Sequence, residues 1–160
     1  MRIAKKHQPH ATLVADALGL PHPPSTFDFV LSIAVVHHLS STTRRVQAIA
    51  AMLETLKPAP AMTDIIRNNT SGALIYVWAL EQKQSRRAWD DGDEQDVMVP
   101  WVMKQGAAPQ AVSDKTFDRY YHLYRRGELE QDVVAAGGAI VDSGYEKDNW
   151  WAIAVRKPSE

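Results

Sequence analysis

The chain has 160 residues, of which 45% are apolar and 23% are charged, and its formal net charge at pH 7 is -1. This length is sufficient for one domain with a buried core, and the composition is typical of a globular protein. The near-zero net charge excludes a global basic field for nucleic acid, although a local basic patch would still bind RNA. The absence of cysteine excludes disulfides, thiolate catalysis and cysteine-based zinc sites within the chain.

The N-terminal stretch MRIAKKHQPH is basic but lacks the apolar core of a signal peptide. No apolar run approaches the roughly 20 residues of a membrane span. We therefore expect an intracellular protein, located in the cytoplasm or the nucleus. The acidic run DDGDEQD at 90–96 lacks the glutamate at the twelfth position of a calcium loop, so we interpret it as a solvated loop and expect no metal site.

Strand and helix patterns alternate along the first half of the chain. A short strand is predicted at His10–Ala15, and Asp16 marks its end. A second strand, almost wholly apolar, is predicted at Phe27–Ile33, and such a run is typical of a strand covered on both faces. A helix then runs from a cap among residues 40–42 to about Lys57.

The second half contains a longer interruption. A buried strand is predicted at Ala73–Leu80. The polar segment 81–118 shows little periodicity and is interpreted as a long loop insert. A short helix at Arg126–Ala136 ends at two glycines, and the strands Ala139–Ser143 and Trp150–Arg156 are predicted to form a hairpin.

This order of elements predicts one α/β domain over residues 1–160, with a parallel sheet to which the final hairpin adds an antiparallel strand. In such sheets, ligands bind outside the carboxyl ends of the strands. Asp16, the segment SIAVVHH at 32–38 and residues 78–81 all follow predicted strands. We therefore expect them to converge on one crevice.

Two groups at these strand ends are candidates for a site. Asp16 could accept a hydrogen bond from an exocyclic amine, with the Ala17 amide beside it as donor; the alternative is an aspartate that caps a turn. His37 and His38 could form a proton shuttle, a substrate clamp or a metal-ligand pair. Adjacent histidines point in different directions and seldom bind one metal together. The alternative is one buried structural histidine and one histidine at a helix start.

A basic and aromatic group lies further along the chain. Arg86 and Arg87 follow the predicted strand Ala73–Leu80, and the segment RYYHLYRR contains Arg119, Tyr120 and Tyr124. Aromatic rings interleaved with arginines suit an RNA loop, in which bases stack and phosphates pair with guanidinium groups. The alternative is an amphipathic segment with solvated arginines.

Four stretches carry a resemblance to a known family. They are VADALGLPHPPSTFDFVLSIAVVHHLSSTTRR, GALIYVWALEQKQSRRAWDDGDEQDVMVPWV, RYYHLYRRGELEQDVVAAGG and SGYEKDNWWAI. They resemble the eukaryotic tRNA methyltransferases that act on carboxymethyluridine at the wobble position, and the similar domain fused to an AlkB-type oxygenase. The resemblance implies a doubly wound, mostly parallel sheet of the class I S-adenosylmethionine-dependent methyltransferase type. It also implies that a methyl group of S-adenosylmethionine esterifies the carboxylate of 5-carboxymethyluridine.

The resemblance implies roles for the candidate residues. A carboxylate is already ionised at neutral pH, so the reaction needs alignment and cations more than a strong base. Asp16 and Ala17 would face adenine, and Ser32, Ile33 and Ala34 would line the methionine part of the cofactor. His37, His38, Arg86 and Arg87 would face the reacting group, while Arg119, Tyr120 and Tyr124 would flank the anticodon loop.

The resemblance also sets expectations about completeness and partners. The family starts with a strand and a glycine-rich loop, whereas none of the eight glycines here stands in a G-x-G pattern. We therefore expect a partial domain that begins just before the third family strand and leaves an edge of Phe27–Ile33 unpaired. The fungal enzymes act with a small zinc-binding activator protein, which is expected to pair along His10–Ala15. The alternative to an enzyme is a non-catalytic module that binds RNA or a partner.

Overall fold

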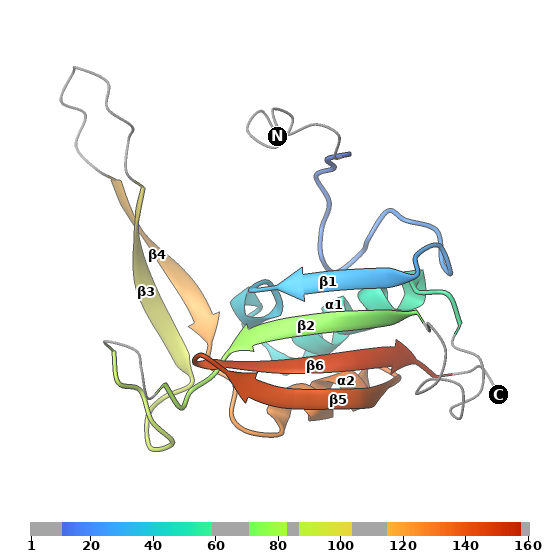
Figure 1. The fold of residues 1–160 in the computed structure, drawn as a ribbon. Coiled ribbons are helices and arrows are strands. Elements are labelled where there is room, and N and C mark those ends of the chain that lie inside the picture. The colour runs from blue at the N-terminus through green and yellow to red at the C-terminus, as the bar shows by residue number, and fades with distance from the viewer. Residues whose placement is uncertain (1–10, 59–70, 83–86, 104–114, 158–160) are drawn as a thin grey trace.

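A computed structural model describes residues 11–58, 71–82, 87–103 and 115–157 (Figure 1). Two helices pack on a four-stranded sheet, and a two-stranded ribbon extends from one end of that sheet. The elements in chain order are β1 (Phe29–Ile33), the 3-10 helix η2 (Val36–His38), α1 (Thr42–Thr55), β2 (Gly72–Trp78), β3 (Asp96–Met103), β4 (Lys115–His122), α2 (Glu128–Ala135), β5 (Gly138–Glu146) and β6 (Asn149–Arg156).

The main sheet is mixed and has the strand order β1-β2-β6-β5. β1 and β2 run parallel, with Leu31 opposite Leu74, while β6 is antiparallel to both of its neighbours. The predicted α/β sheet with an antiparallel C-terminal hairpin is therefore confirmed. Among the described strands of this sheet, the pairing of β1 with β2 is parallel and the two pairings of β6 are antiparallel.

Both helices lie on one face of the sheet (Figure 1). The hydroxyl of Ser41 caps α1 by accepting from the Arg44 amide, as the predicted cap among residues 40–42 requires. Ile49 and Leu53 of α1 are buried against alternate residues of β2, such as Ile75. This periodicity of 3.6 on the helix and 2 on the strand produces the main core.

The other face of β1 is open. Phe29, Leu31 and Ile33 alternate along the strand and are 56%, 59% and 58% exposed. The expectation that this strand is covered on both faces is therefore wrong for the described structure. β1 is also the terminal strand of the sheet order, in agreement with the expected unpaired edge.

Two further expectations need correction. The predicted strand His10–Ala15 is absent over its described residues 11–15, and Asp16 instead closes a turn with Gly19. A strand needs a partner ladder, and an apolar pattern alone does not supply one. The predicted loop insert 81–118 contains the whole of β3 and the start of β4, which pair with each other over eight residues each.

Candidate active site

The carboxyl ends of β1 and β2 meet beside η2, as expected for an α/β sheet. Ala34 follows β1 with a φ of 58°, a left-handed conformation that is uncommon for a residue with a Cβ. Its amide donates to the carbonyl of Tyr76 at 3.1 Å. Strained backbone of this kind is concentrated at functional sites, and here it turns the chain from β1 into the histidine-bearing helix.

His37 is completely buried and uncharged. Its Nδ1 accepts from the backbone N–H of Trp78 at 3.0 Å, so its proton resides on Nε2, which has no hydrogen-bond partner in the described structure. Burial, with smaller contributions from His38 and His122, lowers the pKa of His37 to about 3. His37 is thus enclosed in the described structure, and its lowered pKa favours the neutral form at pH 7, so its predicted catalytic role stays a prediction. It is a positioning residue that links η2 to the end of β2.

His38 has the opposite tautomer. Its Nδ1 lies 2.9 Å from the carbonyl oxygen of Tyr120, which can only accept, so Nδ1 carries the proton. In the neutral imidazole, Nε2 is then an acceptor. Because His38 is only half-buried, this nitrogen remains a candidate for contact with a ligand.

The two histidines belong to an aromatic cluster that we define as His37, His38, Trp78 and Tyr121. The Trp78 and Tyr121 rings stack with centroids 4.4 Å apart and an interplanar angle of 17°. Tyr121 also contacts both histidine rings, at 5.0 and 4.4 Å. The sequence prediction placed Trp78 at the crevice but did not foresee its stacking on Tyr121, because this contact depends on the ribbon returning to the end of β2.

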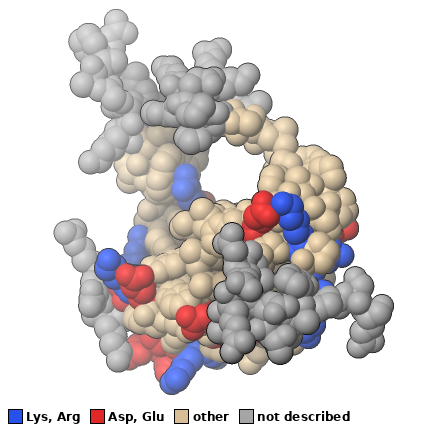
Figure 2. All heavy atoms as spheres, turned by 45° about the vertical axis from the view of Figure 1, so that its right-hand side comes forward, with Lys and Arg blue, Asp and Glu red and all other residues tan. Residues whose placement is uncertain are grey.

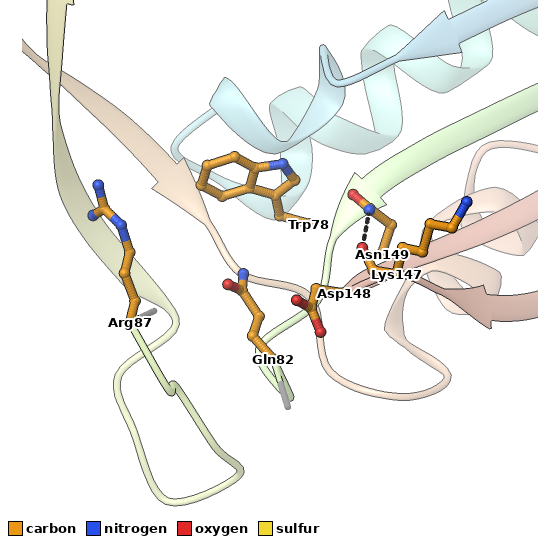
Figure 3. Close-up of a pocket in the computed structure, with 6 residues that line it drawn as sticks. All are labelled: Trp78, Gln82, Arg87, Lys147, Asp148 and Asn149. Atoms are coloured by element: carbon orange, nitrogen blue, oxygen red, sulfur yellow. Dashed lines mark hydrogen bonds between the residues drawn. The ribbon is translucent and has the colours of Figure 1, made fainter. Parts of the chain in front are cut away.

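A cleft of about 250 Å³ opens beside this cluster (Figure 3). Arg87 and Lys147 extend on opposite sides of the Trp78 indole. We call this space the Trp78 cleft. Arg86, the neighbour predicted to act with Arg87, lies outside the described residues. The lining residues are Trp78, Gln82, Arg87, Lys147, Asp148 and Asn149.

The turn between β5 and β6 builds one wall of the Trp78 cleft. Lys147 and Asp148 both have positive φ, at 48° and 63°, as a tight hairpin of this twist requires. The Asn149 side chain donates to the carbonyl of Lys147 at 2.7 Å, and the carbonyl of Asp148 accepts from the Ala79 amide at 3.0 Å. The segment GYEKDN was predicted as a hairpin connection. Its place in the site follows from β6 pairing with β2.

A second cavity of about 180 Å³ lies between β1, η2 and α1. Its lining is apolar apart from Ser32, whose buried hydroxyl oxygen has no hydrogen-bond partner in the described structure. An apolar slot with one unsatisfied hydroxyl suits a flat ring that carries polar atoms, such as adenine. The lining residues are Ala17, Leu20, Val30, Leu31, Ser32, Val35, Val36, Ala48 and Met52.

The structure unites part of the predicted cofactor set. Ala17 and Ser32 line this second cavity together. Ile33 points to the open face of the sheet, and Ala34 forms the turn after β1. Asp16 is exposed, and its Oδ1 accepts from the Leu18 amide at 2.9 Å, so at least this oxygen caps a turn.

The three residues that were predicted to contact RNA lie in different surroundings. Arg119 is exposed, with its guanidinium 3.9 Å from the centroid of the Trp101 ring. The Tyr120 hydroxyl donates to Asp96, and burial together with this bond raises the pKa of Tyr120 to about 12. Tyr124 is completely buried, and its hydroxyl donates to Asp132 at 3.0 Å. Tyr124 therefore packs in the core, and its predicted contact with RNA is corrected.

A network of charged side chains fixes the base of the ribbon to the helices. Buried Arg45 of α1 pairs with Asp132 at 3.3 Å and Glu128 at 3.2 Å, both on α2. His122 at the end of β4 lies 2.7 Å from Glu128 and 2.8 Å from Asp96. Burial opposes protonation of His122, but the hydrogen bonds with these two carboxylates outweigh it and raise its pKa.

The described residues contain no helix long and apolar enough to cross a membrane. They also contain no group of three or more histidine, cysteine, aspartate or glutamate side chains placed to hold a metal ion. Charged side chains of both signs are interspersed on the face shown in Figure 2, and no field of one sign covers it.

The sequence profile described as "Methyltransferase domain" matches residues 1–63. The tRNA (carboxymethyluridine(34)-5-O)-methyltransferase of Schizosaccharomyces pombe is 43% identical, and the match covers 90% of this chain and 63% of that protein. The protein of the same name from Saccharomyces cerevisiae is 36% identical, over 91% of this chain and 68% of its own length. The chain belongs to the tRNA (carboxymethyluridine(34)-5-O)-methyltransferase family.

Solved structures support the same fold. An S-adenosylmethionine-dependent methyltransferase from Clostridium acetobutylicum matches with a TM-score of 0.65 and 10% identity, over 98% of this chain and 68% of that one. DesVI from Streptomyces venezuelae matches with a TM-score of 0.63 and 19% identity, over 96% and 68%. The fold is thus the predicted class I methyltransferase type. This member of the carboxymethyluridine methyltransferase family spans about two thirds of the length of its fungal relatives.

Proposed function

We propose that the chain forms the substrate-binding part of an enzyme that methylates the carboxylate of 5-carboxymethyluridine at the tRNA wobble position, with S-adenosylmethionine as methyl donor. The observation that carries this proposal is the Trp78 cleft, where a flat indole lies between Arg87 and Lys147. A pyrimidine base can stack on an indole, and the guanidinium of Arg87 can pair with a carboxylate attached to that base. The names of the fungal relatives supply the identity of the base.

The proposed chemistry requires little acid–base catalysis. A free carboxylate has a pKa near 4, so the substrate is already ionised and nucleophilic at neutral pH. Arg87 would orient it, and the positive charge of Arg87 would favour its entry into the cleft. Neutral His37 would not exchange protons in the reaction. It would hold the end of β2, while His38 Nε2 would accept a hydrogen bond from the RNA.

The described residues form a cavity that suits the adenine end of the methyl donor. S-adenosylmethionine, when bound, supplies an activated methyl group on sulfur. The cavity beside Ala17 and Ser32 would hold its adenine ring, and Asp16 would accept from the adenine amine through its carboxylate. The cavity lining contains no charged group for the amino-acid end of the cofactor.

Methyl transfer can be tested with tRNA that bears 5-carboxymethyluridine and with S-adenosylmethionine labelled in the methyl group. One reaction contains this chain alone, and a second also contains the segment of the S. pombe relative that this chain does not match. Mass spectrometry should find the label as the methyl ester of the wobble nucleoside, which mild alkali removes. RNA binding without label in either reaction, while the intact S. pombe relative labels the same tRNA, would favour the non-catalytic module.

We also propose a partner and a location, both implied by the family resemblance. A small zinc-binding activator would contact residues 11–15, where exposed Leu13 and Val14 offer apolar side chains in place of the predicted strand edge. Co-purification of the activator with a Leu13→Asp, Val14→Asp variant at full yield would refute this contact. A tRNA substrate is compatible with the cytoplasm or the nucleus.

A further inference from the structure

The ribbon formed by β3 and β4 has two chemically distinct faces. Directly opposed residues share a face, and successive pairs alternate between faces. One face carries the pairs Val97–Tyr121, Val99–Arg119, Trp101–Phe117 and Met103–Lys115. We call it the basic-aromatic face. The opposite face carries the pairs Asp96–His122, Met98–Tyr120, Pro100–Asp118 and Val102–Thr116.

Charge separates between the two faces. Among the paired ribbon residues, Lys115 and Arg119 lie on the basic-aromatic face, whereas Asp96 and Asp118 lie on the opposite face, where His122 pairs with Asp96. A polyanion is therefore attracted more strongly to the basic-aromatic face than to the opposite face. The net charge of the chain conceals this local separation.

The basic-aromatic face starts at the candidate active site. Tyr121, at its inner end, stacks on Trp78, which lines the Trp78 cleft. The next rings outward are Trp101 and Phe117, with centroids 6.3 Å apart, and they are 38% and 47% exposed. Arg119 covers Trp101 from the same face. Rings and cations thus extend outward from the cleft along one surface.

We propose that the basic-aromatic face binds the single-stranded nucleotides next to the wobble base. Their bases would stack on Trp101 and Phe117, and their phosphates would pair with Arg119 and Lys115. Exposed aromatic rings accept any base, while lysine and arginine track the backbone, so this contact would be tolerant of sequence. The inference rests on the proposed function, because it takes the wobble base in the Trp78 cleft as its starting point.

Two matched double variants of the 160-residue chain test this surface. Trp101→Ser with Phe117→Ser removes rings from the basic-aromatic face. Met98→Ser with Val102→Ser removes exposed apolar side chains from the opposite face, and circular dichroism verifies that both variants are folded. Fluorescence anisotropy with a labelled anticodon stem–loop and with oligouridylate measures binding.

The first variant should bind both RNAs about ten- to a hundredfold more weakly, and the second should bind within about twofold of the unchanged chain. Replacing Lys115 or Arg119 by glutamine should reduce the slope of log affinity against log salt by about 0.7 each. A 5-bromouridine next to the wobble position should photocrosslink to Trp101 or Phe117, as mapped by mass spectrometry.

The outcomes separate this inference from the proposed function. If the unchanged chain binds no RNA, or if the first variant binds as tightly as the second, the basic-aromatic face is not an RNA surface. If both results support the face but no reaction yields the methyl ester, the RNA surface stands and the proposed methyl transfer fails. An apolar protein partner on this face would show as RNA binding that is insensitive to the first variant.

Discussion

At the scale of single residues, the two adjacent histidines have different tasks. His37 is buried, neutral and bonded to the Trp78 amide, while His38 is half-buried and bonded to the Tyr120 carbonyl. The sequence predicted that this pair ends a buried strand at the site. It could not predict the tautomers, because their partners lie 41 and 82 residues away in the chain.

His37→Leu should destabilise the protein by about 1–3 kcal/mol, because the buried Trp78 amide loses its acceptor. The pKa of His37 is lowered in the folded state from 6.5 to about 3, so the unfolded state takes up the proton first as pH falls. This residue therefore makes stability fall between about pH 6.5 and 3. Urea unfolding should show that dependence weakened in His37→Leu, with His38→Leu as the control. An unchanged acid profile would refute the assignment.

At the scale of elements, local patterns located most of the fold. Predicted helices and strands match α1, α2, β1, β2, β5 and β6 within a few residues, because caps, glycine ends and apolar periodicity are local signals. β3 and β4 were missed because Pro100 and several polar side chains obscure the alternation of a ribbon exposed on both faces. The prediction of a strand at His10–Ala15 was wrong because an apolar pattern is present but residues 11–15 pair with no neighbouring strand.

The same limit applies to the candidate site. Ligands bind outside the carboxyl ends of parallel strands. From the sequence alone, this rule placed His38 and Arg87 at the same edge of the sheet, because each follows a predicted strand. Lys147 and Tyr121 reach the site only through the pairing of β6 with β2 and the docking of β4. Such long-range contacts leave no local pattern in the sequence.

The docking of the ribbon should depend on pH through His122. The pKa of His122 is raised in the folded state, so its pairing with Glu128 and Asp96 stabilises the protein fully below the unfolded pKa of 6.5. That contribution is lost as the pH rises through the raised folded value. Separate ion pairs of Arg45 with Glu128 and Asp132 link the two helices.

His122→Gln should cost about 1.5–3 kcal/mol of unfolding free energy near pH 6, and less at alkaline pH. Denaturant unfolding at a series of pH values measures this difference. A constant cost across the series would contradict the role of the charged His122. Replacing exposed Asp142 of β5 by asparagine is a control that leaves the network intact.

At the scale of the whole molecule, the sheet presents an open apolar face. Phe29, Leu31 and Ile33 are exposed on β1, which ends the described sheet. An exposed apolar strand at a sheet edge promotes association between chains. The 160-residue chain should therefore self-associate as its concentration rises.

Leu31→Lys should shift sedimentation velocity profiles toward the monomer at equal concentration, because a charge on the strand opposes edge pairing. Met98→Lys on the ribbon, at a similar exposure of 60% against 59%, is the matched control. Identical association of both variants would show that the open face of β1 is not responsible.

In the proposed function, the Trp78 cleft recognises the carboxylate of the wobble base. The most direct measurement compares the affinity of this chain for two anticodon stem–loops that differ only in carrying 5-carboxymethyluridine or uridine at that position. We expect about tenfold tighter binding of the carboxymethylated RNA, since a charge-assisted contact contributes roughly 1.5–3 kcal/mol. Arg87→Gln should abolish this preference while the chain still binds both RNAs. Equal affinity of the unchanged chain for the two RNAs would show that the Trp78 cleft does not recognise the carboxylate.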